Sequence, residues 1–334
     1  MKFLPILEKH IAYAKSNIKR IVLPEGDDER VLTAAKIAID EELAVPVLIG
    51  DEKIISDKAK TIGLSLDKIE IVNSRSSDKI GEFCEEYVAI RGKGTTSAAL
   101  RLMEDPLYFG AMMLRKGMVD GCVTGSVYNS ADVVKAAVYI IGAIEKGKKI
   151  SSFFLMNFPN VNFGENGNLI YADCAVNPDP DAETLAHIAI STANSAKVLF
   201  GWEPRIAMLS FSTKGSAKHP LASKVIEATN IIKGVFPDLL VDGELQGDSA
   251  IIDYVAQRKC PDSKIGGKAN ILIFPTLDAG NICYKLSERV SGGSAIGPIF
   301  QEIAKPINDL SRGCSAEDIV NNIIITTYET QFLG

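Results

Sequence analysis

The sequence contains no run of about 18 consecutive apolar residues, which is the length that a membrane-spanning helix requires. Its first 20 residues, MKFLPILEKHIAYAKSNIKR, carry charges throughout and lack the apolar core of a secretory signal. Their pattern is typical of an amphipathic helix. We therefore expect a cytoplasmic protein without a transmembrane segment.

The cysteines and histidines are too widely spaced in the sequence to indicate a metal site or a C-x-x-C redox motif. The six cysteines include no C-x-x-C pair, and the three histidines do not pair at metal-ligand spacing. Glu183 and His187 stand four residues apart on an expected helix, but surface pairs commonly share that spacing. We therefore expect reduced thiols, as in a cytoplasm, and no metal site.

Basic residues are fewer than acidic ones, and the net charge of −6 argues against a general nucleic-acid binder. A hydrophobic content of 46% with 23% charged residues is typical of a globular protein with a full core. At roughly 150 residues per domain, the length of 334 residues predicts two domains.

Short apolar runs alternate with segments of helical periodicity along the chain. The run at 20–26 ends in Pro and Gly, and a helical pattern follows before the next apolar run. The same order recurs where 117–125 precedes 130–147, and where 205–212 precedes 221–237. This alternation predicts an α/β fold with largely parallel sheets.

Two glycine-containing connections, at 143–152 and 290–298, mark the expected domain boundaries. They divide the chain into a first domain of residues 1–146 plus 298–334 and an inserted second domain of residues 147–297. A cleft between two domains is the default place for a ligand.

The segment CVTGSVYNSAD (122–132) is an expected strand-to-helix turn suited to anions. Thr124, Gly125 and Ser126 leave the strand, and Ser130 is placed to cap the following helix. Main-chain amides and short hydroxyls at such a helix start bind phosphate. An ordinary turn with an N-cap explains the same residues equally simply.

A second turn, LSFSTKGSAKHP (209–220), places Ser212 and Lys214 between a strand and a helix. Hydroxyls, a glycine and ammonium groups make it the better phosphate loop of the two. It is not a Walker A sequence, because the G-x-x-x-x-G-K-[ST] pattern is absent.

The densest polar cluster is NDLSRGCSAED (308–318). Ser315 and Asp318 have the spacing of a capping box before an apolar helix, with Asp in place of the usual Glu or Gln. In that interpretation Arg312 is a surface charge and Cys314 a small buried group, more suited to packing than to nucleophilic attack. An Asp at a helix N-terminus is also stabilised as its anion, which weakens it as a base.

Six longer motifs resemble the phosphate acetyltransferase (phosphotransacetylase) family, and the resemblance runs from about residue 18 to the end. They are LPEGDDER, DPLYFGAMMLRKGMVDG, MLSFSTKGSAK, DGELQGDSA, FPTLDAGNICYKLSER and GPIFQEIAKPINDLSRGCSAED. The last two are highly specific, because such long polar strings seldom recur by chance. Phosphate butyryltransferases share the superfamily.

The resemblance implies transfer of an acyl group between phosphate and the thiol of coenzyme A, within acetate metabolism. The thiol would attack acetyl phosphate directly in a ternary complex, with no acyl-enzyme and no metal. Coenzyme A is then a substrate, so no cofactor is expected. The implied fold is two α/β domains with the active site in the cleft between them, in a homodimer that makes its contact through the second domain. Neither a nucleic acid nor a membrane is an expected partner.

The resemblance also implies roles for single residues. Asp318 matches the base that deprotonates the thiol, Arg312 the arginine that holds the phosphoryl group, and Ser311 the hydroxyl that positions the carbonyl group. Arg91 and Arg30 match arginines associated with coenzyme A or substrate binding. We also expect Tyr284, in the fifth motif, to bind substrate.

One segment departs from the family pattern. Where many members read close to S-G-A-A-H-S-T-A-D-T-x-R-P, this chain reads TGSVYNSADVVKA. Tyr128 replaces a histidine, and Lys135 replaces an arginine, which keeps the charge but loses the bidentate fork. We still expect Lys135 to contact the substrate, but propanoyl or butanoyl transfer remains open beside acetyl transfer.

Two other classes of function compete with acyl transfer. A decarboxylating hydroxy-acid dehydrogenase would need a metal-binding carboxylate cluster and a nicotinamide fingerprint, and the sequence shows no convincing fingerprint. A non-catalytic, acyl-CoA-binding regulatory module is the other alternative, which the altered segment around Tyr128 keeps open.

Overall fold

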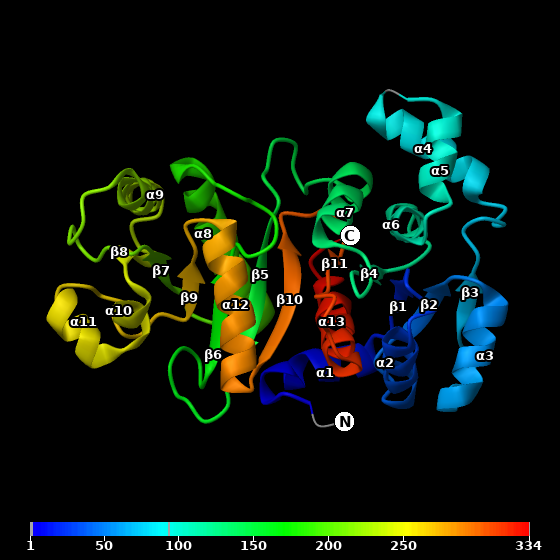
Figure 1. Cartoon of the computed structure of the whole chain (residues 1–334), viewed down its shortest axis with the longest axis horizontal. Helices are drawn as coiled ribbons and strands as arrows, with labels where there is room; N and C mark the ends of the chain where they lie inside the picture. The colour runs from blue at the N-terminus through cyan, green and yellow to red at the C-terminus, as the bar shows by residue number, and fades with distance from the viewer. Residues whose placement is uncertain (1–2, 93, 334) are drawn as a thin grey trace. The chain divides into compact units, whose positions relative to one another are not determined.

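The computed structural model describes residues 3–92 and 94–333, and the chain divides into two compact units (Figure 1). The first unit joins residues 1–148 to residues 303–334, and the second spans Lys149–Glu302. The return expected at residue 298 falls inside strand β10 (Ser294–Gln301). Because β10 pairs with β5 (Ser151–Asn157), the chain returns to the first unit at Ile303.

The first unit is built on a five-stranded sheet in the order β11-β4-β1-β2-β3, and every pairing in it is parallel. Its strands are β1 (Arg20–Leu23), β2 (Val45–Ile49), β3 (Glu70–Val72), β4 (Gly121–Val123) and β11 (Ile307–Asn308). Its helical segments are η1 (Pro5–Leu7), α1 (Glu8–Ser16), α2 (Glu29–Asp40), α3 (Glu52–Ile62), α4 (Ile80–Arg91), α5 (Thr96–Met103), α6 (Pro106–Arg115), α7 (Ser130–Ala136), η2 (Ala137–Ile141) and α13 (Ala316–Glu329).

The strand order reverses between β1 and β4. The chain steps outward from β1 to β2 and β3 on one side, and then places β4 and β11 on the other. In parallel α/β sheets, ligands bind outside the carboxyl ends of the strands at such a switch point. The turns that follow β1, β4 and β11 are therefore the first place to look for a site in this unit.

Helix α13 is the central helix of the first unit, and residues Ile319 to Glu329 are all buried. It packs against α1, α2 and β4, and three of its four isoleucines, Ile319, Ile323 and Ile324, share one apolar cluster with residues of α2 and β4. Because burial holds the helix on nearly every side, its first turn is fixed over the carboxyl end of the sheet.

The predicted helix over 130–147 is shorter than the pattern suggested. It continues from α7 through the π-helical turn η2 and ends at Ile141. Gly142 follows with a φ of +82°, a backbone conformation that only glycine adopts readily, and this turn stops the helix.

The second unit carries a six-stranded sheet in the order β10-β5-β6-β9-β7-β8. The pairings β6–β9, β9–β7 and β7–β8 are parallel. The pairings β10–β5 and β5–β6 are antiparallel. The further strands are β6 (Asn168–Ala172), β7 (Arg205–Leu209), β8 (Leu240–Leu245) and β9 (Ile271–Ile273). The helical segments are α8 (Ala182–Ser195), η3 (Ala196–Phe200), α9 (Pro220–Val235), α10 (Gly247–Ile251), α11 (Asp253–Lys259) and α12 (Leu277–Ser291). The predicted α/β class is confirmed.

All six cysteines are free thiols, and five of them are buried. Within residues 3–92 and 94–333, no helix is both long enough and apolar enough to cross a membrane.

Candidate active site

Three turns at the carboxyl end of the first sheet, together with the first turns of the helices that follow them, carry most of the predicted site residues. They are the β1–α2 turn (24–28), the β4–α7 turn (124–129) and the β11–α13 turn (309–315). Hydrogen bonds join all three, although the chain segments that form them lie far apart in the sequence.

A buried carboxylate, Glu25, organises the β4–α7 turn. Its Oε1 accepts hydrogen bonds from the amides of Gly125 (2.9 Å), Val127 (3.0 Å) and Tyr128 (3.3 Å). Its Oε2 accepts one from the Thr124 hydroxyl at 3.1 Å. Burial raises the pKa of Glu25, and these hydrogen bonds oppose that rise. The amides that the sequence offered to a phosphate are thus occupied by a carboxylate of the same chain.

Sequence reasoning missed Glu25, although its position carried a signal. It follows the buried strand β1 within two residues, on the edge of a parallel sheet where ligands and functional groups gather. Only the fold shows that its partner is the turn about 100 residues further along the chain.

Arg30, in the first turn of α2, links all three turns. Its Nε and Nη2 donate to the carboxylate of Asp28 at 3.0 and 2.7 Å. Its Nη2 also donates to the carbonyl oxygen of Ser126 at 2.8 Å. Its Nη1 donates to the carbonyl oxygens of Arg312 (2.8 Å) and Cys314 (3.2 Å). Burial of Asp28 works against ionisation, but the hydrogen bonds from Arg30 hold the pKa of that carboxyl below its usual range.

Gly125 brings the β4–α7 turn directly onto the β11–α13 turn. A Cβ at this position would lie 2.0 Å from Oδ1 of Asp309 and 2.7 Å from the amide nitrogen of Leu310. The φ of +104° also favours glycine. The close approach of the two turns therefore requires a residue without a side chain.

The β11–α13 turn presents Ser311 and Arg312. The Ser311 hydroxyl accepts a hydrogen bond from the amide of Gly313 at 3.3 Å. The Arg312 side chain is exposed, and in the described part of the chain its guanidinium makes neither a hydrogen bond nor an ion pair. That group remains available to an anion.

The predicted capping box at the start of α13 is confirmed. The Ser315 hydroxyl accepts from the Asp318 amide at 3.1 Å, and Asp318 Oδ2 accepts from the Ser315 amide and hydroxyl, both at 2.8 Å. Among the described residues, Oδ1 of Asp318 takes no hydrogen bond. The carboxylate therefore caps the helix with Oδ2, and Oδ1 is available to accept a hydrogen bond or a proton.

Cys314 is buried between these groups with 7% of its surface exposed. Burial raises the pKa of its thiol to about 12, although the nearby Arg30 opposes the rise. A thiol with that pKa stays protonated at neutral pH and is a poor nucleophile.

The hydroxyl of Ser126 is the one predicted ligand group that is both buried and unpaired in the described structure. The residue is 2% exposed, and its Oγ has no hydrogen-bond partner among residues 3–92 and 94–333. Buried hydroxyls without a partner are rare in folded proteins, and each one needs an explanation. A ligand that supplies the missing partner is such an explanation.

Helix α7 begins differently from the prediction. Asn129, not Ser130, is its N-cap, because Asn129 has the extended backbone of a cap and its side chain accepts from the Asp132 amide at 3.0 Å. Ser130 is already the first helical residue.

Two residues that depart from the family pattern have partners within the first unit. The Tyr128 hydroxyl donates to Oδ1 of Asp105 at 2.7 Å, and burial followed by that hydrogen bond raises the pKa of the phenol. Lys135 forms an exposed ion pair with Asp132 at 3.1 Å. Tyr128 is therefore tied to the start of α6, whereas Lys135 is held only weakly.

Arg91 packs its guanidinium over the ring of Tyr139, 3.9 Å from the ring centre. Tyr139 follows Lys135 by four residues in the continuous α7–η2 helical segment, so the two lie on one face. Arg91 thus contacts the same helical segment that carries Lys135.

The remaining predicted residues lie in the second unit. The Ser212 hydroxyl and the Gly215 amide both donate to Glu244, at 2.8 and 2.7 Å. The Lys214 ammonium is paired with Asp242. Burial would raise the pKa of Asp242, but hydrogen bonds led by that from Lys214 lower it to about 2. This turn, like the one in the first unit, is filled by carboxylates of the chain itself.

Tyr284 lies in the core of the second unit. Its ring is 4% exposed and stacks on Phe154 with ring centres 3.9 Å apart. Any contact with a substrate is therefore limited to the small part of this side chain that reaches the surface.

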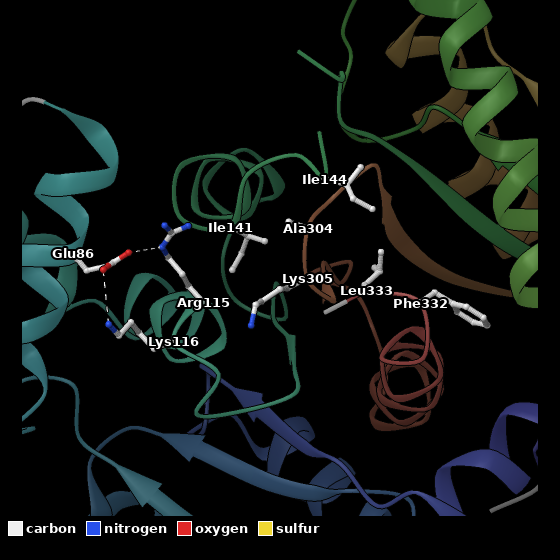
Figure 2. A pocket seen from close by; sticks show the side chains of 9 residues that line it. All are labelled: Glu86, Arg115, Lys116, Ile141, Ile144, Ala304, Lys305, Phe332 and Leu333. Carbon is white, nitrogen blue, oxygen red and sulfur yellow. Dashed lines mark hydrogen bonds and ion pairs between the residues drawn. The ribbon is translucent and has the colours of Figure 1, made fainter. Parts of the chain in front are cut away.

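A cavity of about 680 Å³ opens elsewhere in the first unit (Figure 2). Its walls include Arg115, Lys305 and Phe332, and none of the residues predicted for the site lines it. Lys305 precedes β11, whereas Ser311 follows it, so the cavity lies towards the opposite end of that strand. No group of side chains within the described residues has the composition of a metal site.

Comparison with known proteins gives concordant matches. A family model described as phosphate acetyl/butaryl transferase matches residues 5–327. The chain is 48% identical to the phosphate acetyltransferase of Thermoanaerobacterium thermosaccharolyticum, over 98% of this chain and 100% of that protein. It is 46% identical to the phosphate acetyltransferase of Acetivibrio thermocellus, over 99% of each. The crystal structure of a phosphotransacetylase from Streptococcus pyogenes matches with a TM-score of 0.89 at 41% identity, over 99% of each chain.

Proposed function

The chain belongs to the phosphate acetyl/butaryl transferase family, and from that premise we propose how it transfers an acetyl group between phosphate and coenzyme A. The resemblance expected from the sequence motifs is confirmed, and with it the assignment as an acyltransferase, a phosphate acetyltransferase. The reaction is acetyl-CoA + phosphate = acetyl phosphate + CoA. The dehydrogenase alternative is thereby excluded.

The exposed and unpaired guanidinium of Arg312 carries the proposal for the site. A guanidinium holds two phosphate oxygens at once and favours departure of the phosphate dianion. The Ser311 hydroxyl, one residue earlier, donates to the carbonyl oxygen of the acetyl group as it becomes negative. Removal of one such donor typically costs about 3 kcal/mol of transition-state stabilisation.

Asp318 takes the proton of the coenzyme A thiol. A thiol with a pKa near 8.5 is mostly protonated at neutral pH, so a carboxylate that accepts its proton accelerates the attack. The capping box occupies Oδ2, and Oδ1 is the oxygen that accepts this proton. The thiolate then attacks the carbonyl carbon of acetyl phosphate directly, and phosphate leaves without an acyl-enzyme. Cys314, buried and protonated, takes no part in bond formation.

The substrates are bound mainly by cationic side chains and by Ser126. Arg91 and Lys135 hold anionic groups of coenzyme A from the α4 and α7–η2 helices. Ser126 donates its unpaired hydroxyl to the acyl phosphate. Coenzyme A acts as a substrate, and the transfer needs no other cofactor. We place the enzyme in the cytoplasm as a homodimer, in which the second unit makes the contact.

Transfer of propanoyl or butanoyl groups is the second candidate. Val127, beside Ser126 in the turn that departs from the family pattern, is 58% exposed. An exposed valine at this position offers apolar surface to a longer acyl chain.

The test is thioester formation from coenzyme A with acetyl, propanoyl and butanoyl phosphate. We expect acetyl phosphate to give the highest kcat/KM. Asp318→Asn should lower kcat by about 100-fold or more with little change in either KM, because general-base catalysis contributes that much. Asp51→Asn, which alters a capping aspartate of α3, is the matched control and should retain full activity.

A higher kcat/KM with a longer acyl phosphate would move the assignment to that acyl group and leave the mechanism intact. No thioester from any of the three would favour the non-catalytic, acyl-CoA-binding module. Full activity of the Asp318 variant would refute its role as the base.

A further inference from the structure

The guanidinium of Arg30 has no donor left for a ligand. A guanidinium carries five N–H groups in a fixed planar fork. Here they face five oxygen atoms of the same chain, two on Asp28 and one each on the carbonyls of Ser126, Arg312 and Cys314. Every one of these distances lies between 2.7 and 3.2 Å.

We propose that Arg30 is a positioning residue that fixes the main chain at Arg312 against the β4–α7 turn, and that it does not contact coenzyme A or acyl phosphate. This inference rests on the proposed function, since it gives Arg312 the phosphoryl group. It differs from the role implied by the family resemblance, in which Arg30 is a ligand contact.

The arrangement of acceptors explains why an arginine is needed. The carbonyl oxygens of Ser126 and Arg312 belong to two different turns, and they are held by neighbouring nitrogens of one rigid group. Asp28 fixes the plane of that group with two parallel hydrogen bonds. A lysine has the same charge but only three donors on one atom, so it cannot span the two turns and Asp28 together.

Glu25 supplies the second anchor. It accepts hydrogen bonds from the amides of Gly125 and Val127, whereas Arg30 donates to the carbonyl oxygen of Ser126 between them. The β4–α7 turn is thus held by two side chains, and Arg30 joins it to the main chain at Arg312. The LPEGDDER motif thereby has a physical role, which is to set the distance between the Ser126 hydroxyl and the Arg312 side chain.

The experiment compares Arg30→Lys with Arg20→Lys. Arg20 forms an exposed ion pair with Glu70 at the amino end of β1, away from the three turns, and is the matched control. We expect Arg30→Lys to lower kcat at least tenfold, with the KM values for coenzyme A and acetyl phosphate within threefold of the parent. We expect the same substitution in an Arg312→Lys background to lower kcat less than threefold, because residues that act through one another are not additive.

Amide hydrogen exchange of the same proteins provides a readout that does not need activity. We expect Arg30→Lys to speed exchange at least fivefold in peptides covering 124–129 and 309–315, and Arg20→Lys to leave both unchanged. If the parent protein formed no thioester, the proposed function would be wrong. The exchange rates of the two peptides would still test whether Arg30 holds the turns in place.

Two results would overturn the inference. One is a tenfold or greater rise in the dissociation constant of coenzyme A, measured by calorimetry, with kcat at saturation intact. That outcome would make Arg30 a ligand contact. The other is unchanged exchange in both peptides, which would show that the guanidinium does not hold the turns.

Discussion

Two buried glutamates each accept hydrogen bonds from the main chain of a turn that follows a parallel strand. Glu25 takes the amides after β4, and Glu244 takes the Gly215 amide and the Ser212 hydroxyl after β7. Such amides are the groups with which many proteins bind phosphate. In this protein Glu25 and Glu244 already occupy them, and we therefore propose that a bound phosphate is held by side chains, above all by Arg312.

Replacement of Ser126 by alanine tests the unpaired hydroxyl. We expect the KM for acetyl phosphate to rise about tenfold, because a hydrogen bond to a charged group contributes about 1.5–3 kcal/mol. The melting temperature should not fall, since the hydroxyl has no partner among the described residues to lose. Steady-state kinetics and thermal unfolding measure the two effects.

Ser74→Ala is the matched control for this substitution. Ser74 is also buried, but its hydroxyl donates to the carbonyl oxygen of Glu104 at 2.7 Å. Its loss should lower stability by about 1 kcal/mol and leave the KM unchanged. An unchanged KM in the Ser126 variant, together with a raised melting temperature, would show that Ser126 is only a poorly satisfied core residue.

At the scale of secondary-structure elements, α13 combines a structural task with a proposed chemical one. Its capping box includes Asp318, which is also the carboxylate that we propose as the base. A capping role and a base role are therefore compatible, because each uses a different carboxylate oxygen. The helix does not move freely, since its residues from Ile319 onward are buried.

Ser315→Ala separates the two tasks. Loss of the cap hydroxyl should lower the free energy of unfolding by about 1 kcal/mol, and kcat should also fall, because Asp318 Oδ2 loses one of its two donors. Thr95→Ala removes the cap of α5 and should cost similar stability with no change in kcat. Urea unfolding and steady-state kinetics on both variants measure the two effects. Equal kcat values in the two variants would show that the Ser315 hydroxyl does not affect catalysis through Asp318.

The sequence predicted these elements to different degrees. Strand β1, helix α2 and the capping box at Ser315 follow from local patterns, and all three are confirmed. The cap of α7 was misplaced by one residue because Asn129 and Ser130 are both good caps, and only backbone geometry distinguishes them. The roles of Glu25 and Arg30 were not predictable from spacing, since their partners lie about 100 and 280 residues away.

At the scale of the whole molecule, one buried acid couples folding to pH. Glu329 ends α13 and is 4% exposed, and its carboxyl accepts a hydrogen bond from the Asn308 side chain on β11. Burial raises the pKa of Glu329 to about 8, although the Asn308 hydrogen bond opposes the rise. The folded protein therefore keeps this proton at pH values where the unfolded chain loses it.

The sign of the resulting pH dependence follows from this difference. The contribution of Glu329 to stability is complete below the unfolded pKa of 4.5 and is lost as the pH rises towards about 8. Across that window the free energy of unfolding should fall by about 1.4 kcal/mol per pH unit from this group alone. Glu329→Gln should remove this component of the slope and make the protein more stable than the parent at pH 8.

Urea unfolding from pH 5 to pH 9 measures the effect. Glu317→Gln, at the exposed start of the same helix, is the control and should leave the slope as in the parent. A Glu329 variant whose stability changes with pH as steeply as the parent's would contradict the assignment.

The first unit is discontinuous in sequence, since residues 149–302 separate its two parts. A ribosome therefore completes the whole second unit before it makes β11 and α13, a delay of about 8 to 30 s at roughly 5–20 residues per second. Until then the apolar faces of α1, α2 and β4 that α13 covers stay open to water. The nascent amino-terminal segment therefore exposes this apolar surface during synthesis, and the first unit can complete its core only after α13 has been translated.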